Sequence, residues 1–343
     1  MIDVLILTLN DSANTAWRYM QCLRMLGLNV MGFKGILHPF YYPEQLPLHP
    51  GLMRHGIEWA KNKSHINLVM GIDHPDLEHF MKQAKVIHFF HTTAFQGQTD
   101  FSKKIVIANH GGYIYRKFHE KWNGFMNKFI DATIIQMPDL LDLGANNEHY
   151  FSFPVQTGFL KPEYRDTTDE LRIGHFPPNA YSKGTADIFN IVDEKIAPKF
   201  SDRLRYGGPT GREEAPIVFI PWYNNLDQLR WADIVIDDVA PLTPGGLGYG
   251  EFGNTSMEAA ALGKIVVANS LRVHKYAEVY GELPEIQIAN TAEELEEVLA
   301  RLFSETPSKI HELQVKTREW VVRNHSMKAH AERLWNEVYK HLM

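Results

Sequence analysis

Short apolar segments alternate with helical patterns along most of the chain, and this alternation limits the fold more than any other feature. The first apolar run is VLILTL at residues 4–9, followed by polar residues 10–12 and then a helical pattern that ends at Gly27. Strands that alternate with helices favour parallel sheets covered on both faces. The sequence therefore predicts an α/β fold. Similar apolar segments recur at residues 86–90, 105–108, 132–136, 173–175, 217–220, 234–236 and 265–268.

The length of 343 residues predicts two domains, because a single core rarely grows to that size. The stretch 154–169 carries prolines, a glycine and charged residues and interrupts the pattern, so we expect the domain boundary there. The prediction is one domain over 1–160, a second over 161–325, and a last helix over 326–343 that crosses back to the first domain. One face of that helix must be buried, and it carries Leu334, Trp335, Val338 and Leu342.

Bulk composition excludes several classes of protein. Hydrophobic residues make up 44% and charged residues 22% of the chain, which is typical of a globular protein and not of a disordered or fibrous one. The net charge of -6 gives no overall attraction to nucleic acid or to an anionic membrane. A lone cysteine, Cys22, cannot form an intramolecular disulfide, and no apolar run reaches the roughly 18 residues of a spanning helix. With no signal-peptide pattern, we expect a cytoplasmic protein.

A glycine-rich segment precedes a helical pattern in the second half. Residues 231–240 read as a helix end, a strand and its polar exit, and five glycines follow within 241–253. Glycines let backbone N–H groups approach a ligand, and the first turn of a helix attracts anions, so phosphate is the natural ligand. The alternative is a surface loop with an ordinary helix cap at Asn254 or Thr255. We interpret Asp233, Asp237 and Asp238 as structural or hydroxyl-binding residues.

This segment resembles a known signature. Asp238-Val239, residues 248–253 and the run from Met257 to Val267 are similar to the GT-B glycosyltransferases, especially family 4. The resemblance implies two Rossmann-like domains facing across a cleft, the first binding the acceptor and the second the nucleotide-sugar donor. It implies that Glu258 contacts the ribose. The donor-binding residues that it implies in the preceding loop and the helix start are Gly248, Tyr249, Gly250, Gly253, Asn254 and Thr255.

Two further matches complete the implied catalytic set. Residues 173–185 resemble the family's strand and loop that end in Lys-Gly, where Lys183 neutralises the leaving diphosphate and Asn179 adds to the donor site. The alternative is a solvated Lys183 beside a helix cap. Many relatives carry a second Glu eight positions before Glu258; here that position is Gly250, and Glu251 follows one step later. We assign Glu251 to the catalytic set on this resemblance.

The first half matches the same family at residues 106–116, a strand followed by His-Gly. The resemblance implies that His110 orients the donor sugar at the reaction centre, whereas a histidine satisfied beside a glycine turn is the alternative. Polar residues after the first strand could bind acceptor hydroxyls or cap the following helix. His88 and His91 are not assigned to a metal. The acceptor-binding candidates are Asn10, Asp11, Ser12 and Asn14.

Basic and aromatic residues interleave over 116–129. Such a helix can meet an anionic lipid surface or a nucleic-acid acceptor. We favour the simpler interpretation, in which the aromatic face packs inward and the basic face is solvated, because Glu120 and Gly124 interrupt the stripe.

The resemblance implies a hexosyltransferase that moves a sugar from a nucleoside diphosphate such as UDP to a hydroxyl of a surface glycan or glycolipid, with retention of configuration. Neither a metal nor a cofactor is obligatory in this scheme, and peripheral contact with the inner membrane surface is compatible with it. The alternatives are a UDP-sugar 2-epimerase, a glycosyltransferase acting on hydroxymethylated DNA bases, and a noncatalytic module that binds nucleotide or glycan.

Overall fold

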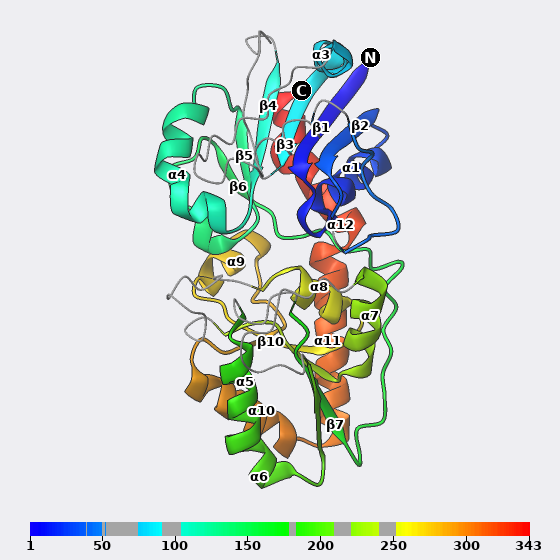
Figure 1. Cartoon of the computed structure of the whole chain (residues 1–343), viewed down its shortest axis with the longest axis vertical. Coiled ribbons are helices and arrows are strands. Elements are labelled where there is room, and N and C mark those ends of the chain that lie inside the picture. The colour runs from blue at the N-terminus through cyan, green and yellow to red at the C-terminus, as the bar shows by residue number, and fades with distance from the viewer. Residues whose placement is uncertain are drawn as a thin grey trace. The chain divides into compact units, whose positions relative to one another are not determined.

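The computed structural model describes residues 1–38, 40–49, 52, 75–90, 104–177, 183–208, 221–239 and 252–343. The chain divides into two compact units, one formed by Met1–Pro154 with Met327–Met343 and the other by Val155–Ser326. Each unit contains a parallel sheet with helices packed on it (Figure 1). The predicted α/β class is therefore confirmed.

In the described part of the first unit, six parallel strands form one sheet in the order β2-β1-β3-β4-β5-β6. The side chains of Val4, Leu5, Ile6 and Leu7 in β1 are fully buried, as expected for a strand covered on both faces. The edge strands β2 and β6 had not been predicted. The strands are β1 (Ile2–Asn10), β2 (Val30–Ile36), β3 (Ala84–Phe90), β4 (Ile105–His110), β5 (Ala132–Ile135) and β6 (Glu148–Tyr150).

The last helical segment of the chain belongs to the core of the first unit. Leu334, Val338 and Tyr339 pack there with Val4 and Tyr19, and Figure 1 shows α12 beside α1. The predicted apolar face of this segment is therefore buried, as its spacing requires. The main helices are α1 (Thr15–Met25), α3 (Pro75–Gln83), α4 (Tyr113–Met126), α12 (Met327–Leu334) and α13 (Lys340–Leu342).

In the described part of the second unit, five parallel strands are ordered β11-β10-β9-β7-β8. Its edge strands, β8 and β11, had not been predicted either, whereas the strand predicted at 217–220 lies outside the described residues. The strands are β7 (Leu171–Gly174), β8 (Leu204–Gly207), β9 (Ile234–Ile236), β10 (Ile265–Ala268) and β11 (Gln287–Ile288).

Helical spacing and caps account for the helices of the second unit. In α10, Leu295, Leu299 and Leu302 share one buried face, and the Thr291 hydroxyl caps the helix by accepting a hydrogen bond from Glu294 N at 3.1 Å. The helices are α5 (Thr185–Ile191), α6 (Ala197–Phe200), α7 (Trp222–Trp231), α8 (Asn254–Ala261), α9 (Val273–Tyr280), α10 (Ala292–Ser304) and α11 (Pro307–His325).

Candidate functional site

The strand order of the second unit places a topological switch between β7 and β9. From β7 the chain continues to β8 on one side, and it later returns to β9 on the other side. Connections that diverge in this way open a crevice at the carboxyl ends of the two strands, where open α/β sheets bind ligands. Lys183 follows β7, and Asp237 and Asp238 follow β9. These three residues define the candidate site.

An ion-pair cluster joins the two strand exits. The Nζ atom of Lys183 lies 2.9 Å from Oδ1 of Asp237 and 2.9 Å from Oδ2 of Asp238. The carboxylates are buried, with side-chain exposures of 3% and 0%, and the lysine side chain is 18% exposed. A buried charge needs a partner of opposite sign, and each member of this cluster has one. The prediction of a solvated lysine does not describe this side chain.

Each charged group in the cluster stabilises the ionised form of its partner. Burial lowers the pKa of Lys183, but the charges of Asp237 and Asp238 outweigh burial, so the pKa of the ammonium lies above its usual value. Burial raises the pKa of Asp237, yet the charge of Lys183 and the hydrogen bonds from Ser256 and Gly253 bring that pKa below its ordinary range. At neutral pH the lysine is therefore a cation and Asp237 an anion.

Asp237 also holds the amino end of α8. Its Oδ2 atom accepts hydrogen bonds from Gly253 N at 3.0 Å and from Ser256 Oγ at 2.7 Å. One carboxylate therefore connects a lysine from the β7–α5 connection to the first turn of α8.

Glu258 has a buried tryptophan as a hydrogen-bond partner, which the motif did not indicate. Its Oε1 atom accepts a hydrogen bond from Trp222 Nε1 at 3.0 Å, and both side chains are buried. The Trp222 indole stacks on the ring of Phe159, with centroids 5.6 Å apart and planes 24° apart. The tryptophan fixes the carboxylate, so the orientation of Glu258 depends on α7 as well as on α8.

A buried histidine completes the framework of this site. His175 follows β7, and its Nδ1 atom lies 2.9 Å from the carbonyl oxygen of Ile236 in β9. Its Nε2 atom lies 2.8 Å from the hydroxyl of Thr185, the first residue of α5. Burial lowers the pKa of His175 to about 4, so the imidazole is neutral at physiological pH. His175 therefore connects β7, β9 and α5. The sequence analysis did not identify this residue.

In the first unit, the loop after β1 makes structural hydrogen bonds. Asp11 is buried, and its carboxylate accepts hydrogen bonds from Ala16 N at 2.7 Å and Trp17 N at 3.1 Å, which caps α1. Burial raises the pKa of Asp11 to about 6. The Nδ2 atom of Asn14 donates to Glu44 O at 2.7 Å. Capping, one of the two predicted roles of this loop, is therefore present.

The structure describes the side chain of Asn10 but only the backbone of Ser12. Asn10 ends β1 and is partly buried, and its Oδ1 atom has no hydrogen-bond partner among the described residues. The backbone of Ser12 begins a short 3-10 turn, whereas its side chain lies outside the described atoms. Ala13 and Asn14 have φ of 55° and 57°, a left-handed conformation that is uncommon for residues other than glycine.

His110 ends β4 and is buried against aromatic rings. Its ring stacks on Tyr115, with centroids 4.2 Å apart and planes 4° apart, and its Nε2 atom accepts a hydrogen bond from Trp122 Nε1 at 3.2 Å. An indole can only donate, so Nε2 is unprotonated and the ring proton is on Nδ1 in the neutral tautomer. The role of orienting a sugar stays a prediction.

Two buried carboxamides lie beside His110 and had not been predicted. Asn109 and Gln136 are 0% and 1% exposed, and none of their four side-chain nitrogen and oxygen atoms has a hydrogen-bond partner among the described residues. Gln136 lies against Gly111, where an added Cβ atom would meet its Oε1 atom at 2.5 Å. Register places Asn109 opposite Ile134, two residues before Gln136, so both carboxamides project from one face of the sheet.

The stripe of basic and aromatic residues falls on α4 and the turn after it. Trp122 is partly buried and packs toward the core, whereas Lys117 and Lys121 are exposed. Arg116 forms an ion pair with Asp139. This arrangement agrees only in part with the favoured interpretation, because Phe129 is exposed and the Arg116 side chain is mostly buried, and it offers no support for a membrane or nucleic-acid surface.

The structure brings some of the predicted donor residues together. Lys183 and Gly253 both meet Asp237, and Asn254 and Thr255 open α8 directly after it. In the described ranges, no three His, Cys, Asp or Glu side chains lie close enough to hold a metal ion. Five predicted site residues lie outside the described residues: Asn179, Gly248, Tyr249, Gly250 and Glu251.

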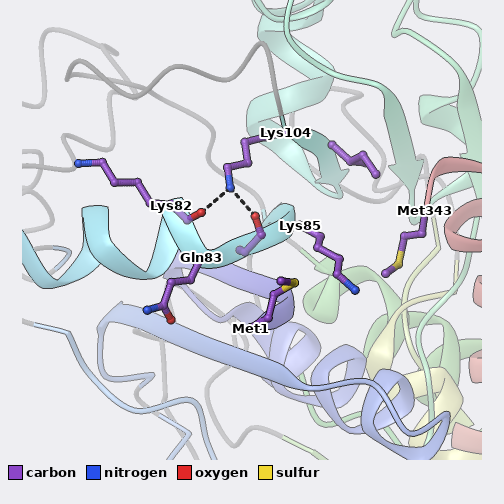
Figure 2. Close-up of a pocket in the computed structure, with 8 residues that line it drawn as sticks. Met1, Lys82, Gln83, Lys85, Lys104 and Met343 are labelled. Carbon is purple, nitrogen blue, oxygen red and sulfur yellow. Dashed lines mark hydrogen bonds between the residues drawn. The ribbon is translucent and has the colours of Figure 1, made fainter.

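A pocket in the first unit lies away from the strand exits. Figure 2 shows Met1, Lys82, Lys85 and Lys104 around it, and Lys104 Nζ donates to the carbonyl oxygens of Lys82 at 2.7 Å and Ala84 at 2.6 Å. Its volume of about 760 Å³ is large enough for a ligand. However, it lies at the amino ends of β3 and β4, the end of a parallel sheet at which ligands rarely bind.

Comparison with known proteins gives matches in structure alone. No family model and no curated protein matches the chain. HepE of Anabaena, solved with UDP and glucose, is 10% identical with a TM-score of 0.59, over 99% of this chain and 100% of that one. A UDP-forming α,α-trehalose-phosphate synthase from Burkholderia xenovorans is 11% identical with a TM-score of 0.59, over 99% of both chains.

A third match is the sucrose-phosphate synthase of Thermosynechococcus elongatus, 12% identical with a TM-score of 0.55 over 99% of both chains. The matched proteins are glycosyltransferases of the GT-B fold, and the chain has this fold. Among the described helices, none is both long enough and apolar enough to cross a membrane.

Proposed function

We propose that the protein is a glycosyltransferase that takes its sugar from a nucleoside diphosphate, with UDP as the leaving group. The observation that carries this proposal is the cluster at the switch point of the second unit. There Lys183 supplies a cation and the first turn of α8 supplies backbone N–H groups, and Asp237 links the two. A cation beside the amino end of a helix suits a diphosphate.

Glu258 gives the proposal a second contact. A carboxylate accepts hydrogen bonds from hydroxyl groups, and a ribose offers two of them side by side. The Glu258 side chain is held by Trp222, so its orientation is set before the nucleotide arrives. Solved structures with the same fold contain UDP or UDP-glucose, which supports a uridine nucleotide as the donor. Glu251, Asn179 and residues 248–250 belong to the proposed donor site by resemblance.

The first unit is the proposed acceptor domain. We assign acceptor contacts to Asn10, Asp11, Ser12 and Asn14, and sugar orientation to His110. Asp11 serves as a helix cap as well, so its contact with an acceptor hydroxyl would use a lone pair not already engaged. The proposed reaction transfers a hexose, with retention of configuration, to a hydroxyl of a glycan or glycolipid.

An epimerase on the same fold is the main competing enzyme class, and the described carboxylates disfavour it. Epimerisation needs acidic side chains that can exchange protons near the sugar ring. Asp237 and Asp238 are both paired with Lys183, and Glu258 accepts a hydrogen bond from Trp222. Because the charge of Lys183 and the hydrogen bonds from Ser256 and Gly253 keep the pKa of Asp237 below its ordinary value, this carboxylate is a poor proton donor at neutral pH.

The test starts with nucleotide binding. Thermal unfolding is followed with UDP, GDP, ADP and their glucose and N-acetylglucosamine derivatives, since a ligand that binds only the folded state raises the unfolding temperature. The matching sugar nucleotide is then incubated with and without glycan and glycolipid acceptors. Free UDP is quantified, and the anomeric configuration of the product is read by NMR.

We expect UDP to raise the unfolding temperature and UDP release to increase when the right acceptor is added. Release of an epimerised sugar without acceptor would show that the protein is an epimerase and not a transferase. Nucleotide binding with no turnover, unchanged by Lys183→Ala, would indicate a noncatalytic module. A protein that is not stabilised by any of these nucleotides is not a nucleotide-sugar enzyme.

A further inference from the structure

We propose that Asp237 is a positioning residue for the diphosphate of the donor, an inference that rests on the proposed function. It sets the separation between the Lys183 ammonium and the first turn of α8. These are the two groups assigned to the phosphates. Asp237 itself stays behind them and does not touch the nucleotide.

The two oxygen atoms of the Asp237 carboxylate bond to different groups. Oδ1 of Asp237 lies 2.9 Å from Lys183 Nζ, while Oδ2 accepts from Gly253 N at 3.0 Å and Ser256 Oγ at 2.7 Å. These partners are all donors, and the carboxylate side chain is only 3% exposed. A single buried side chain therefore bonds to both Lys183 and the amino end of α8.

An amide cannot replace this carboxylate. In the Asp237→Asn variant one of the two oxygens becomes an NH₂ group, which only donates. Turned one way it would face the Lys183 ammonium, and turned the other way it would face the Gly253 N–H. In Asp237→Asn either the bond to Lys183 or the bond from Gly253 N must therefore break, although size and shape are conserved, whereas the Ser256 hydroxyl can also accept from an amide.

The electrostatic effect of the same change has the opposite sign. Asp237 is a negative charge near the place where an anionic diphosphate binds, so removing it would by itself strengthen binding. Loss of positioning would weaken binding. Because the two roles predict opposite changes in affinity, the affinity of Asp237→Asn for UDP distinguishes them.

A matched control lies at the other end of the same strand. Asp233 precedes β9 and is also buried, and its carboxylate holds Arg165 and accepts a hydrogen bond from Arg172 N at 2.9 Å. Asp233→Asn removes a buried, paired charge from the second unit as Asp237→Asn does. It lies at the amino end of β9, so it leaves the switch point unchanged.

The experiment measures dissociation constants for UDP and for uridine by isothermal titration calorimetry. The proteins are the wild type, Asp237→Asn, Asp233→Asn and Ser256→Ala. Uridine carries the base and ribose but no phosphate, so it reports on Glu258 and not on the groups that Asp237 positions. Ser256→Ala removes one tether to α8 without leaving Lys183 unpaired, and it keeps the proposal testable if Asp237→Asn does not fold.

We expect Asp237→Asn to raise the Kd for UDP about tenfold or more, as for a lost charge-assisted hydrogen bond, with the Kd for uridine unchanged. Ser256→Ala should show a smaller change of the same kind, and Asp233→Asn should change neither constant. Equal weakening of UDP and uridine, or tighter binding of UDP, would overturn the positioning role while the proposed function stands. Wild-type protein that binds no UDP overturns the proposed function itself.

Discussion

The indole Nε1 of Trp222 donates a hydrogen bond to Oε1 of Glu258 at 3.0 Å, and neither side chain is more than 3% exposed. Trp222 is the first residue of α7, and Glu258 lies within α8. The two residues are 36 positions apart in the sequence. A carboxylate held by a buried donor keeps one orientation, which is what a ribose contact requires. Under the proposed function, the affinity of the protein for nucleosides should therefore depend on Trp222.

Trp222→Phe keeps an aromatic ring against Phe159 and removes only the indole donor. We expect the Kd values for UDP and uridine to rise together, each about tenfold, because the change acts on the ribose contact and not on the phosphates. Trp231→Phe, at the other end of α7, is the control and should leave both constants unchanged. Weaker binding of UDP alone would show that Glu258 does not hold the ribose.

Lys183→Met should destabilise the protein in a pH-dependent way. Removing one partner of a buried ion pair typically costs about 3–5 kcal/mol. In the variant, Asp237 and Asp238 would lie side by side without a cation, and their pKa values would rise above the usual value of 3.8. The wild-type Asp237 has a lowered pKa and loses stability only as the pH falls below 3.8.

The difference in unfolding free energy between the wild type and Lys183→Met should therefore shrink from pH 8 toward pH 4, as the variant's carboxylates gain protons. Urea unfolding at several pH values measures it. Lys199→Met is the control, because the Lys199–Glu296 pair is exposed and such pairs contribute about 0–1 kcal/mol. A difference independent of pH would show that the two carboxylates are not coupled to the lysine.

The sequence predicted the interior strands of both sheets and missed the edges. The interior strands, such as β1 and β9, are buried on both faces and read as continuous apolar runs. The four missed strands, β2, β6, β8 and β11, are the outermost strands of the two sheets as far as the described residues form them. An edge strand such as Leu204–Gly207 buries only part of its surface and carries exposed Arg205 and Tyr206, so no apolar run marks it.

At the candidate site, local motifs identified single residues but not their partners. Lys183 and Glu258 were found because each lies in a short recognisable pattern. The residues that hold them, Asp237 and Trp222, are 54 and 36 positions away and meet them only through the packing of β9 and α7. His175 gave no signal, because one histidine after a strand resembles any other until its two ring partners are known.

Asp11 gives a second pH dependence, with the opposite sign to that of Asp237. Burial raises its folded pKa to about 6, against an ordinary 3.8, so this carboxyl group contributes most stability below pH 3.8 and loses it as the pH rises through 6. Asp11→Asn has no such titration. The unfolding free energy of the wild type relative to Asp11→Asn should therefore increase by about 2 kcal/mol from pH 7 to pH 4. A constant or falling difference would contradict burial as the dominant effect on this group.

Gln136→Met should stabilise the protein. Both polar atoms of Gln136 lack partners among the described residues, although the side chain is 1% exposed. Removing an unsatisfied buried amide recovers about 1–3 kcal/mol of desolvation cost, and methionine has nearly the same shape. The unfolding temperature should rise by about 2–4 °C for each kcal/mol gained.

Gln45→Met is the matched control and should lower stability, because the Gln45 amide bonds to Lys34 and to the carbonyl of Tyr42. A loss of stability in Gln136→Met would mean that this carboxamide is satisfied by bound water, which the apolar side chain displaces.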